Sequence, residues 1–502
     1  MSPRMPRFSL DEQPEVFFTT TSSSRAIRGL LDEGRARKLG PRLYTKNLSD
    51  DLEVVTRRNW SRIAAGYFRG AVVVDRTALE GGPASDGSVT LATTTKNEQR
   101  IPGLRLRPRL GHGPVEGDVR WMGEELYFSS PARAFLENMR SSRARGGLPR
   151  TLSAAELEER LDQHALLRPS ALNELRDEAR ALAHKLDAEE EFERLDALIG
   201  ALSGTRPGAL HSTRGRARRA GVPFDPLRIE RFGGLQGYLQ QVAAPSVAAN
   251  QVHELSTFAF FEAYFSNFIE GTEFTLEEAE RIVFEHVVPR QRPQDAHDIL
   301  GTYRVVSDVE QRQRVPADAD ELIDVLLSQH AMMLSERPDV GPGQFKLEPN
   351  RAGSTYFVEP QLVEGTLREG FRCYDSLPAG FHRAVFAMFL VSEVHPFADG
   401  NGRIARILMN SELTAAGKQR ILVPIASRYD YLNAVRAMTH NSNASSYVRV
   451  MAGLQSRSAE GDFANRAAAE LWLHRQGAFR DPAEEQGIDA RMLDAAQTTE
   501  TA

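Results

Sequence analysis

The sequence has few of the features that mark secreted or membrane proteins. Its 502 residues include one cysteine, Cys373, which excludes a disulfide framework and fits a reducing compartment. Residues 1–15 have no apolar signal core, and the longest purely apolar run, residues 384–391, is too short to cross a bilayer. We therefore expect a soluble, cytoplasmic protein without a membrane partner.

Lysine is also scarce, because only six of the 62 basic residues are lysines. Such an excess of arginine is typical of genomic composition bias, so a cluster of arginines carries little weight by itself as a binding signal. The formal net charge of −6 is spread along the chain. No overall field therefore points to nucleic acid or to a membrane surface.

The apolar share of the chain, 41%, is enough for several domains with their own cores. Runs rich in β-branched residues and glycine indicate strands in the N-terminal half, and apolar residues at helical spacing dominate the C-terminal half. We expect a multidomain fold with an α+β N-terminal half and a mostly α-helical C-terminal half. The predicted parts are 1–58 (short helices and strands), 59–149 (a small mixed α/β domain), 150–203 (a helical segment), 204–226 (a glycine-, proline- and arginine-rich linker), 227–456 (the main helical domain) and 457–502 (a helical or frayed tail).

The stretch HPFADGNGRIAR, residues 395–406, lies between two apolar helical patterns. We interpret it as a helix-to-helix turn that ends at a helix N-terminus, where free N–H groups and the helix dipole favour an anion. Gly400 and Gly402 let a ligand approach the backbone closely. Arg403 and Arg406, three residues apart, can both meet phosphate oxygens. The turn therefore predicts a phosphate-binding nest.

Two further side chains extend this prediction from phosphate binding to chemistry. Asp399 supplies a hard oxygen ligand beside the nest, as magnesium bound to a di- or triphosphate requires. His395 is the one group in the stretch that accepts a proton near neutral pH. Together these residues predict a magnesium-nucleotide site with a general base.

Each feature also has an ordinary structural explanation. A histidine before proline often caps a helix, GNG is a common turn, and Arg-x-x-Arg is common on a solvated helix face. Their joint occurrence in one short stretch favours a site. A zinc site is disfavoured, because His382 and His440 do not have ligand spacing relative to His395. A Walker-type loop is absent, since no lysine follows the glycines.

The stretch resembles the signature of Fic-domain proteins, H-P-F-x-[D/E]-G-N-G-R-x-x-R, at every defined position. The resemblance extends over residues 235–450 and includes a hairpin at 345–360 that looks like the family's target-docking flap. It implies a mostly α-helical Fic fold and transfer of AMP from ATP to a hydroxyl side chain of a target protein, with release of pyrophosphate. The target, the kind of hydroxyl and a different transferred group such as UMP all remain open.

The same resemblance implies a role for each motif residue. His395 would deprotonate the target hydroxyl, Phe397 would anchor the turn in the core, and Asp399 would hold Mg²⁺. The phosphates of the substrate ATP would contact the remaining residues, which are Gly400, Asn401, Gly402, Arg403 and Arg406. These roles fit phosphoryl-group transfer, which depends mainly on positioning and charge neutralisation.

The stretch FSNFIEGTEF places Ser266, Glu270 and Gly271 at S-x-x-x-E-G spacing. Alone, this pattern describes a solvated glutamate before a C-capping glycine. Beside the Fic signature it resembles the family's inhibitory helix, [S/T]-x-x-x-E-[G/N], and we place that helix at 260–271. The resemblance implies that Glu270 pairs with Arg406 and occupies the γ-phosphate position. In some family members the same glutamate positions a water that removes AMP, so de-AMPylation remains open.

The serine-rich stretch near the N-terminus predicts a short helix, capped within Ser22–Ser24 and followed by a hairpin. This pattern resembles the winged helix of AbiEi-like antitoxin and regulator proteins, and the part at 59–149 resembles their companion domain. The resemblance implies DNA as a partner, contacted through Ser23, Ser24, Arg25 and Arg28. A winged helix used for protein contacts is the alternative.

A rival function of a different class follows from this N-terminal resemblance. The protein would be a DNA-binding regulator whose Fic domain senses nucleotide or acts as a scaffold. The stretch RGRARRAG, residues 214–221, could also touch a phosphate backbone, but we prefer to interpret it as an arginine-biased linker. An oligomer is compatible with either function.

Overall fold

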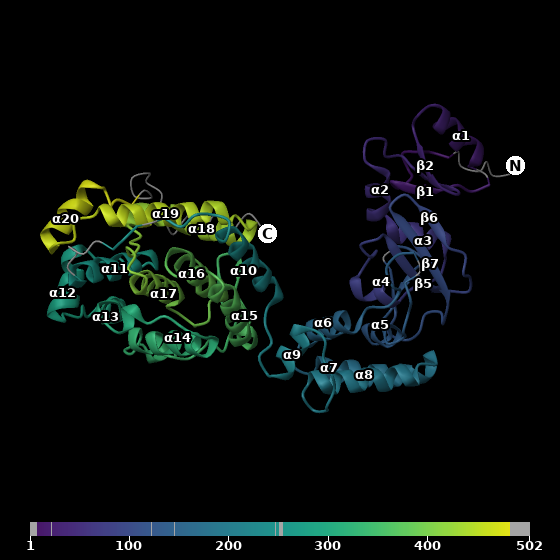
Figure 1. Cartoon of the computed structure of the whole chain (residues 1–502). Coiled ribbons are helices and arrows are strands. Elements are labelled where there is room, and N and C mark those ends of the chain that lie inside the picture. The colour runs from purple at the N-terminus through teal and green to yellow at the C-terminus, as the bar shows by residue number, and fades with distance from the viewer. Residues whose placement is uncertain are drawn as a thin grey trace. The chain divides into compact units, whose positions relative to one another are not determined.

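The computed structural model describes residues 8–21, 23–121, 123–144, 146–245, 247–249 and 255–481. The chain divides between Gly221 and Val222 into two compact units (Figure 1). The N-terminal unit combines two sheets with helices, and the C-terminal unit is almost entirely helical, as the sequence predicts. Among the described residues, no helix is long and apolar enough to cross a membrane.

The N-terminal unit begins with a helix packed on a three-stranded antiparallel sheet. Ile27 and Leu30 of the helix are buried against Phe17. The predicted helix and hairpin are therefore present. Ser22 lies outside the described residues, and the hydroxyl of Ser23 binds Thr20 instead of capping the helix. The elements, with sheet order β1-β3-β2, are β1 (Val16–Phe18), α1 (Ser24–Asp32), β2 (Arg37–Gly40) and β3 (Leu43–Thr45).

A six-stranded mixed sheet with the order β6-β7-β5-β4-β9-β8 forms the second part of this unit, as the strand-like runs predict. Its longest strands, β5 and β7, are parallel neighbours. The strands are β4 (Val72–Val73), β5 (Ser88–Thr93), β6 (Gln99–Ile101), β7 (Leu104–Leu110), β8 (Val119–Arg120) and β9 (Tyr127–Phe128), and the helices are α2 (Leu52–Arg58), α3 (Trp60–Tyr67), α4 (Asp75–Glu80) and α5 (Pro131–Asn138).

One hydrophobic core spans the predicted domain boundary at residue 58. Leu43 and Val55, which precede the boundary, belong to the same buried cluster as Ile63, Val73 and Leu91, which follow it. The two predicted parts therefore fold around a shared core, because the short first sheet is too small to bury its apolar face alone.

The predicted helical segment is confirmed as α6 (Ala154–Ala165), α7 (Ala171–Ala183) and α8 (Glu189–Leu202). The predicted linker at 204–226 is only partly correct, because it contains a further helix, α9 (Thr213–Arg219), which packs against α6. Arg214 and Arg218, one turn apart, both bind Asp162 of α6, at 2.6 and 2.5 Å. α9 is held by ion pairs and has no apolar stripe. A search for apolar periodicity therefore misses this helix.

The C-terminal unit packs its helices around a central pair. α16 and α17 contact each other most extensively and lie in the middle of the unit, with α10, α11, α14 and α15 around them (Figure 1). Most residues of both central helices are buried. The helices are α10 (Pro226–Leu239), α11 (Leu255–Ile269), α12 (Leu276–Glu285), α13 (Pro293–Ser307), α14 (Ala319–Met333), α15 (Val363–Asp375), α16 (Phe381–Val394), α17 (Asn401–Ala415), α18 (Arg428–Asn441), α19 (Ala444–Glu460) and α20 (Arg466–Arg475).

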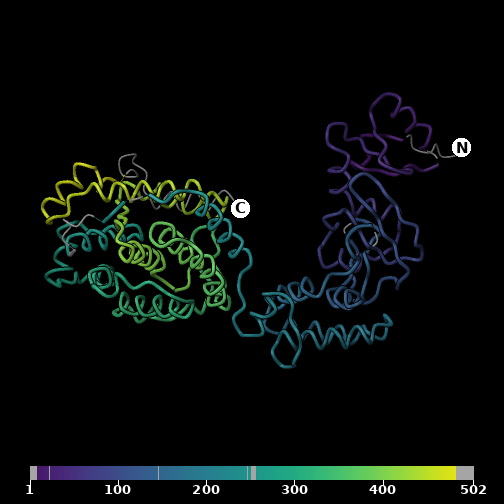
Figure 2. Tube along the Cα trace, in the orientation of Figure 1, coloured from purple at the N-terminus to yellow at the C-terminus, as the bar shows by residue number. Residues whose placement is uncertain are grey.

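Two smaller features complete this unit. The predicted hairpin is present as β10 (Arg351–Ala352) and β11 (Thr355–Tyr356), shorter than the 345–360 segment that contains it. α18 and α19 pack side by side along one edge of the unit (Figure 2). The predicted tail from 457 begins inside α19 and continues through α20, whose Leu473 is buried. Residues 482–502 lie outside the described part of the chain.

Candidate active site

The motif forms the turn between α16 and α17, as the sequence predicts. His395 ends α16 in a left-handed conformation, with φ +52°. Gly400, with φ +77°, directly precedes α17, and a side chain there would press against Met333. Phe397 is fully buried, and its ring stacks on that of His330 at 3.8 Å. The predicted anchoring position of Phe397 is therefore confirmed.

The side chain of Asn401 closes this turn. Its Oδ1 accepts from the backbone N–H of Phe397 at 2.8 Å, and its Nδ2 donates to the carbonyl of Phe397 at 2.9 Å. Both polar ends of the side chain are thus committed to the turn. Any contact of Asn401 with phosphate would therefore come from its backbone at the start of α17, where N–H groups have no partner within the helix.

The carboxylate of Glu270 lies at this helix N-terminus. A Cβ added to Gly402 would overlap Glu270 Oε1, so the glycine leaves the space that the carboxylate fills. Gly271, with φ +92°, follows the helix that carries Glu270, and α11 ends at Ile269. The predicted helix end is thus confirmed, although α11 begins five residues earlier than the predicted 260–271. An anionic group already occupies the position that the motif predicts for phosphate.

Arg406 is the partner of this carboxylate. Its Nη2 lies 2.6 Å from Glu270 Oε1 and also donates to the carbonyl of Ser266 at 2.9 Å. Its Nε donates to Ser266 Oγ at 2.9 Å, and its Nη1 lies 3.4 Å from the hydroxyl of Tyr431. The side chain of Arg406 is 6% exposed and that of Glu270 34% exposed. Loss of hydration would raise the pKa of Glu270, but the charge and hydrogen bond of Arg406 hold it below its usual value.

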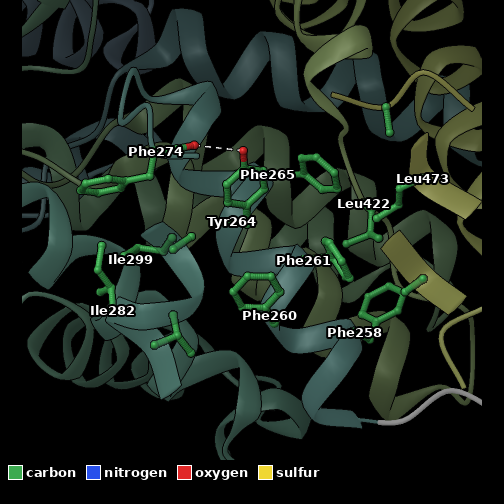
Figure 3. Close-up of a cluster of buried hydrophobic side chains, with 14 of the residues drawn as sticks. Phe258, Phe260, Phe261, Tyr264, Phe265, Phe274, Ile282, Ile299, Leu422 and Leu473 are labelled. Carbon is green, nitrogen blue, oxygen red and sulfur yellow. Dashed lines mark hydrogen bonds between the residues drawn. The ribbon is translucent and has the colours of Figure 1, made fainter. Parts of the chain in front are cut away.

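The position of Glu270 is fixed by the core behind it. α11 is anchored by an aromatic cluster in which Phe258, Phe261 and Phe265 are buried (Figure 3). The hydroxyl of Tyr264 donates to the carbonyl of Phe274 at 3.0 Å and ties α11 to the segment that follows it (Figure 3). Displacing Glu270 therefore requires either a rotation of its own side chain or a shift of the end of α11.

Arg403 is held differently from Arg406. It is 2% exposed, and its Nη1 lies 2.6 Å from Asp298 of α13 and 3.2 Å from Oδ1 of Asn267. Its Nη2 lies 3.4 Å from Asp399. Arg403, which the motif predicts to bind phosphate, thus already has a buried carboxylate partner in Asp298. This pairing fixes the guanidinium beside the turn.

Asp399 lies at the exposed side of the turn, with its side chain 44% exposed. Its Oδ1 accepts from the N–H of Gly400 at 2.7 Å. Within the described part of the chain, no group of three or more His, Cys, Asp or Glu side chains could hold a metal by itself. One open carboxylate suits Mg²⁺, which keeps several waters and binds phosphate oxygens together with one or two carboxylates. The residues present therefore fit a magnesium ion that arrives with a nucleotide.

The imidazole of His395 lies between the turn and the hairpin. Its ring stacks on Phe357 at 3.7 Å, and its Nδ1 lies 3.3 Å from the carbonyl of Ser392. Nδ1–H donating to that carbonyl leaves Nε2 as the acceptor. Loss of hydration lowers the pKa of His395 to about 4, and the charge of Lys346 adds to this effect. The histidine is therefore neutral at neutral pH.

These groups share one cleft of about 190 Å³. Its polar wall includes Glu270, His395 and Arg406, and its apolar wall includes Leu432 and Val435 of α18. The hairpin covers one side. A concave site with a few convergent polar groups and an apolar wall is the usual form of a small-molecule site.

Residues 318–413 match the sequence model of the Fic/DOC family. This part of the chain is therefore similar to the Fic/DOC family. The matched region contains the turn with His395 and Arg406, whereas α11 and Glu270 precede it.

Two curated relatives of the Fic domain are protein adenylyltransferases. "Protein adenylyltransferase Fic" of Nematostella vectensis is 25% identical over 240 residues, which cover 45% of this chain and 54% of the relative. "Protein adenylyltransferase fic-1" of Caenorhabditis elegans is 25% identical over 182 residues, which cover 34% of this chain and 35% of the relative. The chain therefore spans about half or less of the length of these relatives.

Two solved structures are also similar to this chain. "Fic-1 (aa134 - 508)" of C. elegans is 18% identical, covers 62% of this chain and 87% of its own, and has a TM-score of 0.34. A Fic-domain-containing signaling protein of Bacteroides thetaiotaomicron VPI-5482 is 18% identical. The match covers 46% of this chain and 94% of that protein's chain, with a TM-score of 0.35.

Several groups in and around this cleft are not predictable from the motif. Asp298, His330 and Phe357 come from separate segments, and their spacing in the sequence carries no signal that they meet the turn. Tyr431 belongs to YDYLNAVRAM, which follows the motif, but only the fold places its hydroxyl beside Arg406. His330 accepts from the N–H of Gly343 and its Nε2 lies 3.1 Å from the carbonyl of Asp399, so it braces the turn.

Proposed function

We propose that this protein is an adenylyltransferase that transfers AMP from ATP to a hydroxyl side chain of a target protein, and that Glu270 keeps it inactive. The observation that carries the proposal is the Glu270 carboxylate, which is paired with Arg406 and fills the space over Gly402 at the N-terminus of α17. The names of the two curated relatives support the same reaction.

The chemical step is a displacement at the α-phosphorus of ATP. The hydroxyl oxygen of the target attacks this phosphorus, the bond to the bridging oxygen of the β-phosphate breaks, and pyrophosphate leaves with the electron pair. The hydroxyl proton passes to Nε2 of His395. The imidazole is neutral before the reaction because its pKa is about 4. The negative charge of bound triphosphate raises this pKa, so the base becomes stronger once substrate is present.

The phosphates would be held by the start of α17 and by Arg406. The N–H groups of the first turn and the helix dipole favour the negative charge. Arg406 becomes available for the β- and γ-phosphates only when Glu270 releases it, and it can then bind them in bidentate geometry. Mg²⁺ held by Asp399 would neutralise part of the triphosphate charge. Arg403, fixed by Asp298, keeps a positive charge beside Asp399.

The nucleoside and the target would use the remaining walls of the cleft. Leu432 and Val435 offer apolar surface for the base. The hairpin offers strand edges to which an extended target segment could add. Thr355 of β11 is bound to His440 of α18 at 2.9 Å, which holds the hairpin over the cleft.

The experiment that tests this proposal compares ATP labelled at the α-phosphate with ATP labelled at the γ-phosphate. The Glu270→Gly variant is incubated with each, both alone and with a cell lysate that supplies targets. Adenylyl transfer leaves label on protein only from α-labelled ATP. Label from the γ-phosphate would show phosphoryl transfer instead. No label from either, in the presence of lysate and with self-modification measured, would contradict the proposal.

A second function, DNA binding by the N-terminal unit, is favoured by one observation. α1 buries Ile27 and Leu30 and exposes Arg25 and Arg28 on its other face. Electrophoretic mobility with the gene's own upstream DNA tests it, with Arg25→Ala/Arg28→Ala as the control. Binding should fall steeply with salt and persist in His395→Ala. No shift at low salt would exclude this function.

A further inference from the structure

A second concave site lies within the N-terminal unit. It is a cavity of about 430 Å³ beside strand β7 and the segment that follows α5. Its charged lining is dominated by cations. Those residues are Lys96, Arg107, Arg109, Arg143 and Arg150, against one carboxylate, Glu98.

Part of this charge is neutralised by neighbouring carboxylates. Arg109 and Arg150 both pair with the fully buried Asp75, at 3.0 and 2.8 Å. Glu98 is itself engaged by Arg100 and Arg105, each at 2.7 Å. The single carboxylate of the lining is therefore already paired with two arginines outside the lining.

The other three cations, Lys96, Arg107 and Arg143, have no carboxylate within ion-pair distance among the residues that the structure describes. Arg107 is half-buried on β7, and its Nη1 donates to the carbonyl of Leu148 at 2.8 Å. Loss of hydration and the charge of Arg105 lower the pKa of Arg107, and the charges of Asp86 and Glu98 offset this only in part. Half-burying a cation among like charges is unfavourable unless an anion offsets it.

Composition bias does not explain this arrangement. The chain is rich in arginine, but the buried arginines of this unit, such as Arg133, have carboxylate partners. Lys96 is one of only six lysines in the chain. Two of the five cations in the lining are paired with Asp75, and Lys96, Arg107 and Arg143 leave positive charge on the cavity.

We propose that this cavity binds the phosphate groups of a small phosphorylated molecule of about mononucleotide size. Three cations converge on a concave space, and a volume of this order accommodates a small ligand, whereas a duplex needs an extended open surface. Arg107 would supply the half-buried contact, and the exposed Lys96 and Arg143 would close on the ligand from the rim. The site is separate from the Fic domain and does not depend on its proposed reaction.

Calorimetric titration of the full-length protein with inorganic pyrophosphate tests the proposal. The double variant Lys96→Glu/Arg143→Glu should lose one binding site, or its affinity there should fall more than about tenfold. Arg180→Glu, on α7 of the same unit and 59% exposed, is the matched control and should titrate like the parent. Because Lys96 and Arg143 are exposed, their replacement should leave the thermal unfolding midpoint unchanged. Arg107→Gln, which changes the half-buried cation of the cavity, is a second variant and should also weaken pyrophosphate binding.

The same proteins are then titrated with a short duplex DNA. Pyrophosphate binding that is lost in both cavity variants and kept in the control supports the proposal. Equal pyrophosphate titrations in the parent and in both cavity variants overturn it. Duplex binding that is lost in the same variants, without any pyrophosphate binding in the parent, also overturns it, because the ligand would then be a polymer.

Discussion

Oε1 of Glu270 lies 2.6 Å from Nη2 of Arg406, directly over the glycine at the second position of α17. The pair joins the C-terminal end of α11 to the N-terminal part of α17. Arg406 is buried whereas Glu270 keeps a third of its exposure, so the carboxylate can reach solvent without unfolding the site. This asymmetry suits a removable block, since the anion can leave and the cation stays.

The pair should contribute to stability in a pH-dependent way. Breaking a fully buried pair costs roughly 3–5 kcal/mol. Because Glu270 is partly solvated, we expect Glu270→Gln to cost about 1–2 kcal/mol at neutral pH. The pKa of Glu270 is lower in the folded protein, so the stabilisation is present above the usual glutamate pKa and is lost as pH falls through the folded value. Denaturant unfolding of both proteins at several pH values measures this, and a difference that persists unchanged at strongly acidic pH would contradict it.

Gly402 should be required only while Glu270 is present. A Cβ at this position overlaps the carboxylate, so Gly402→Ala should destabilise the parent by about 1–3 kcal/mol. In a Glu270→Gly background most of this cost should disappear. A double-mutant cycle on unfolding free energies measures the coupling. Purely additive costs would show that the two residues do not compete for this space.

Asp298 should matter because it is the buried partner of Arg403. Both side chains are nearly inaccessible, at 6% and 2% exposure, so Asp298→Asn leaves the buried Arg403 with only the more distant and more exposed Asp399. The same change removes the contact of Asp298 with Arg337. We expect a loss of about 3–5 kcal/mol in unfolding free energy. Asp339→Asn is the matched control, because Asp339 is 51% exposed in its pair with Arg337. Similar losses in the two variants would mean that burial of the Arg403 pair is not decisive.

His395 should titrate well below an ordinary histidine. Its pKa is lowered to about 4 by loss of hydration beside Phe357. Phe357→Ala exposes the ring, so the pKa should rise towards the usual value near 6.5. NMR titration of the imidazole, assigned by comparison with His395→Asn, measures both values. A midpoint near 6.5 in the parent would show that the ring is not desolvated.

The turn and the helix that precedes Glu270 could be predicted because each lies in one continuous stretch of sequence. His395 ends α16, and Gly402 and Arg406 lie in the first turns of α17, a few residues further on. Ser266 lies in the last turn of α11, and Glu270 directly follows that helix. Asp298 and Phe357 could not be predicted, since tertiary packing alone brings them to the turn. α9 was missed for a related reason, because Arg214 and Arg218 hold it through Asp162 and no apolar stripe marks it.

The rate of label transfer from α-labelled ATP in the Glu270→Gly variant, relative to the parent, tests the central claim most directly. We expect the variant to label protein at least about tenfold faster, since Arg406 is then free for the phosphates, and the label to vanish when His395→Ala is added. Equal rates in parent and variant, or label that survives His395→Ala, would contradict the account.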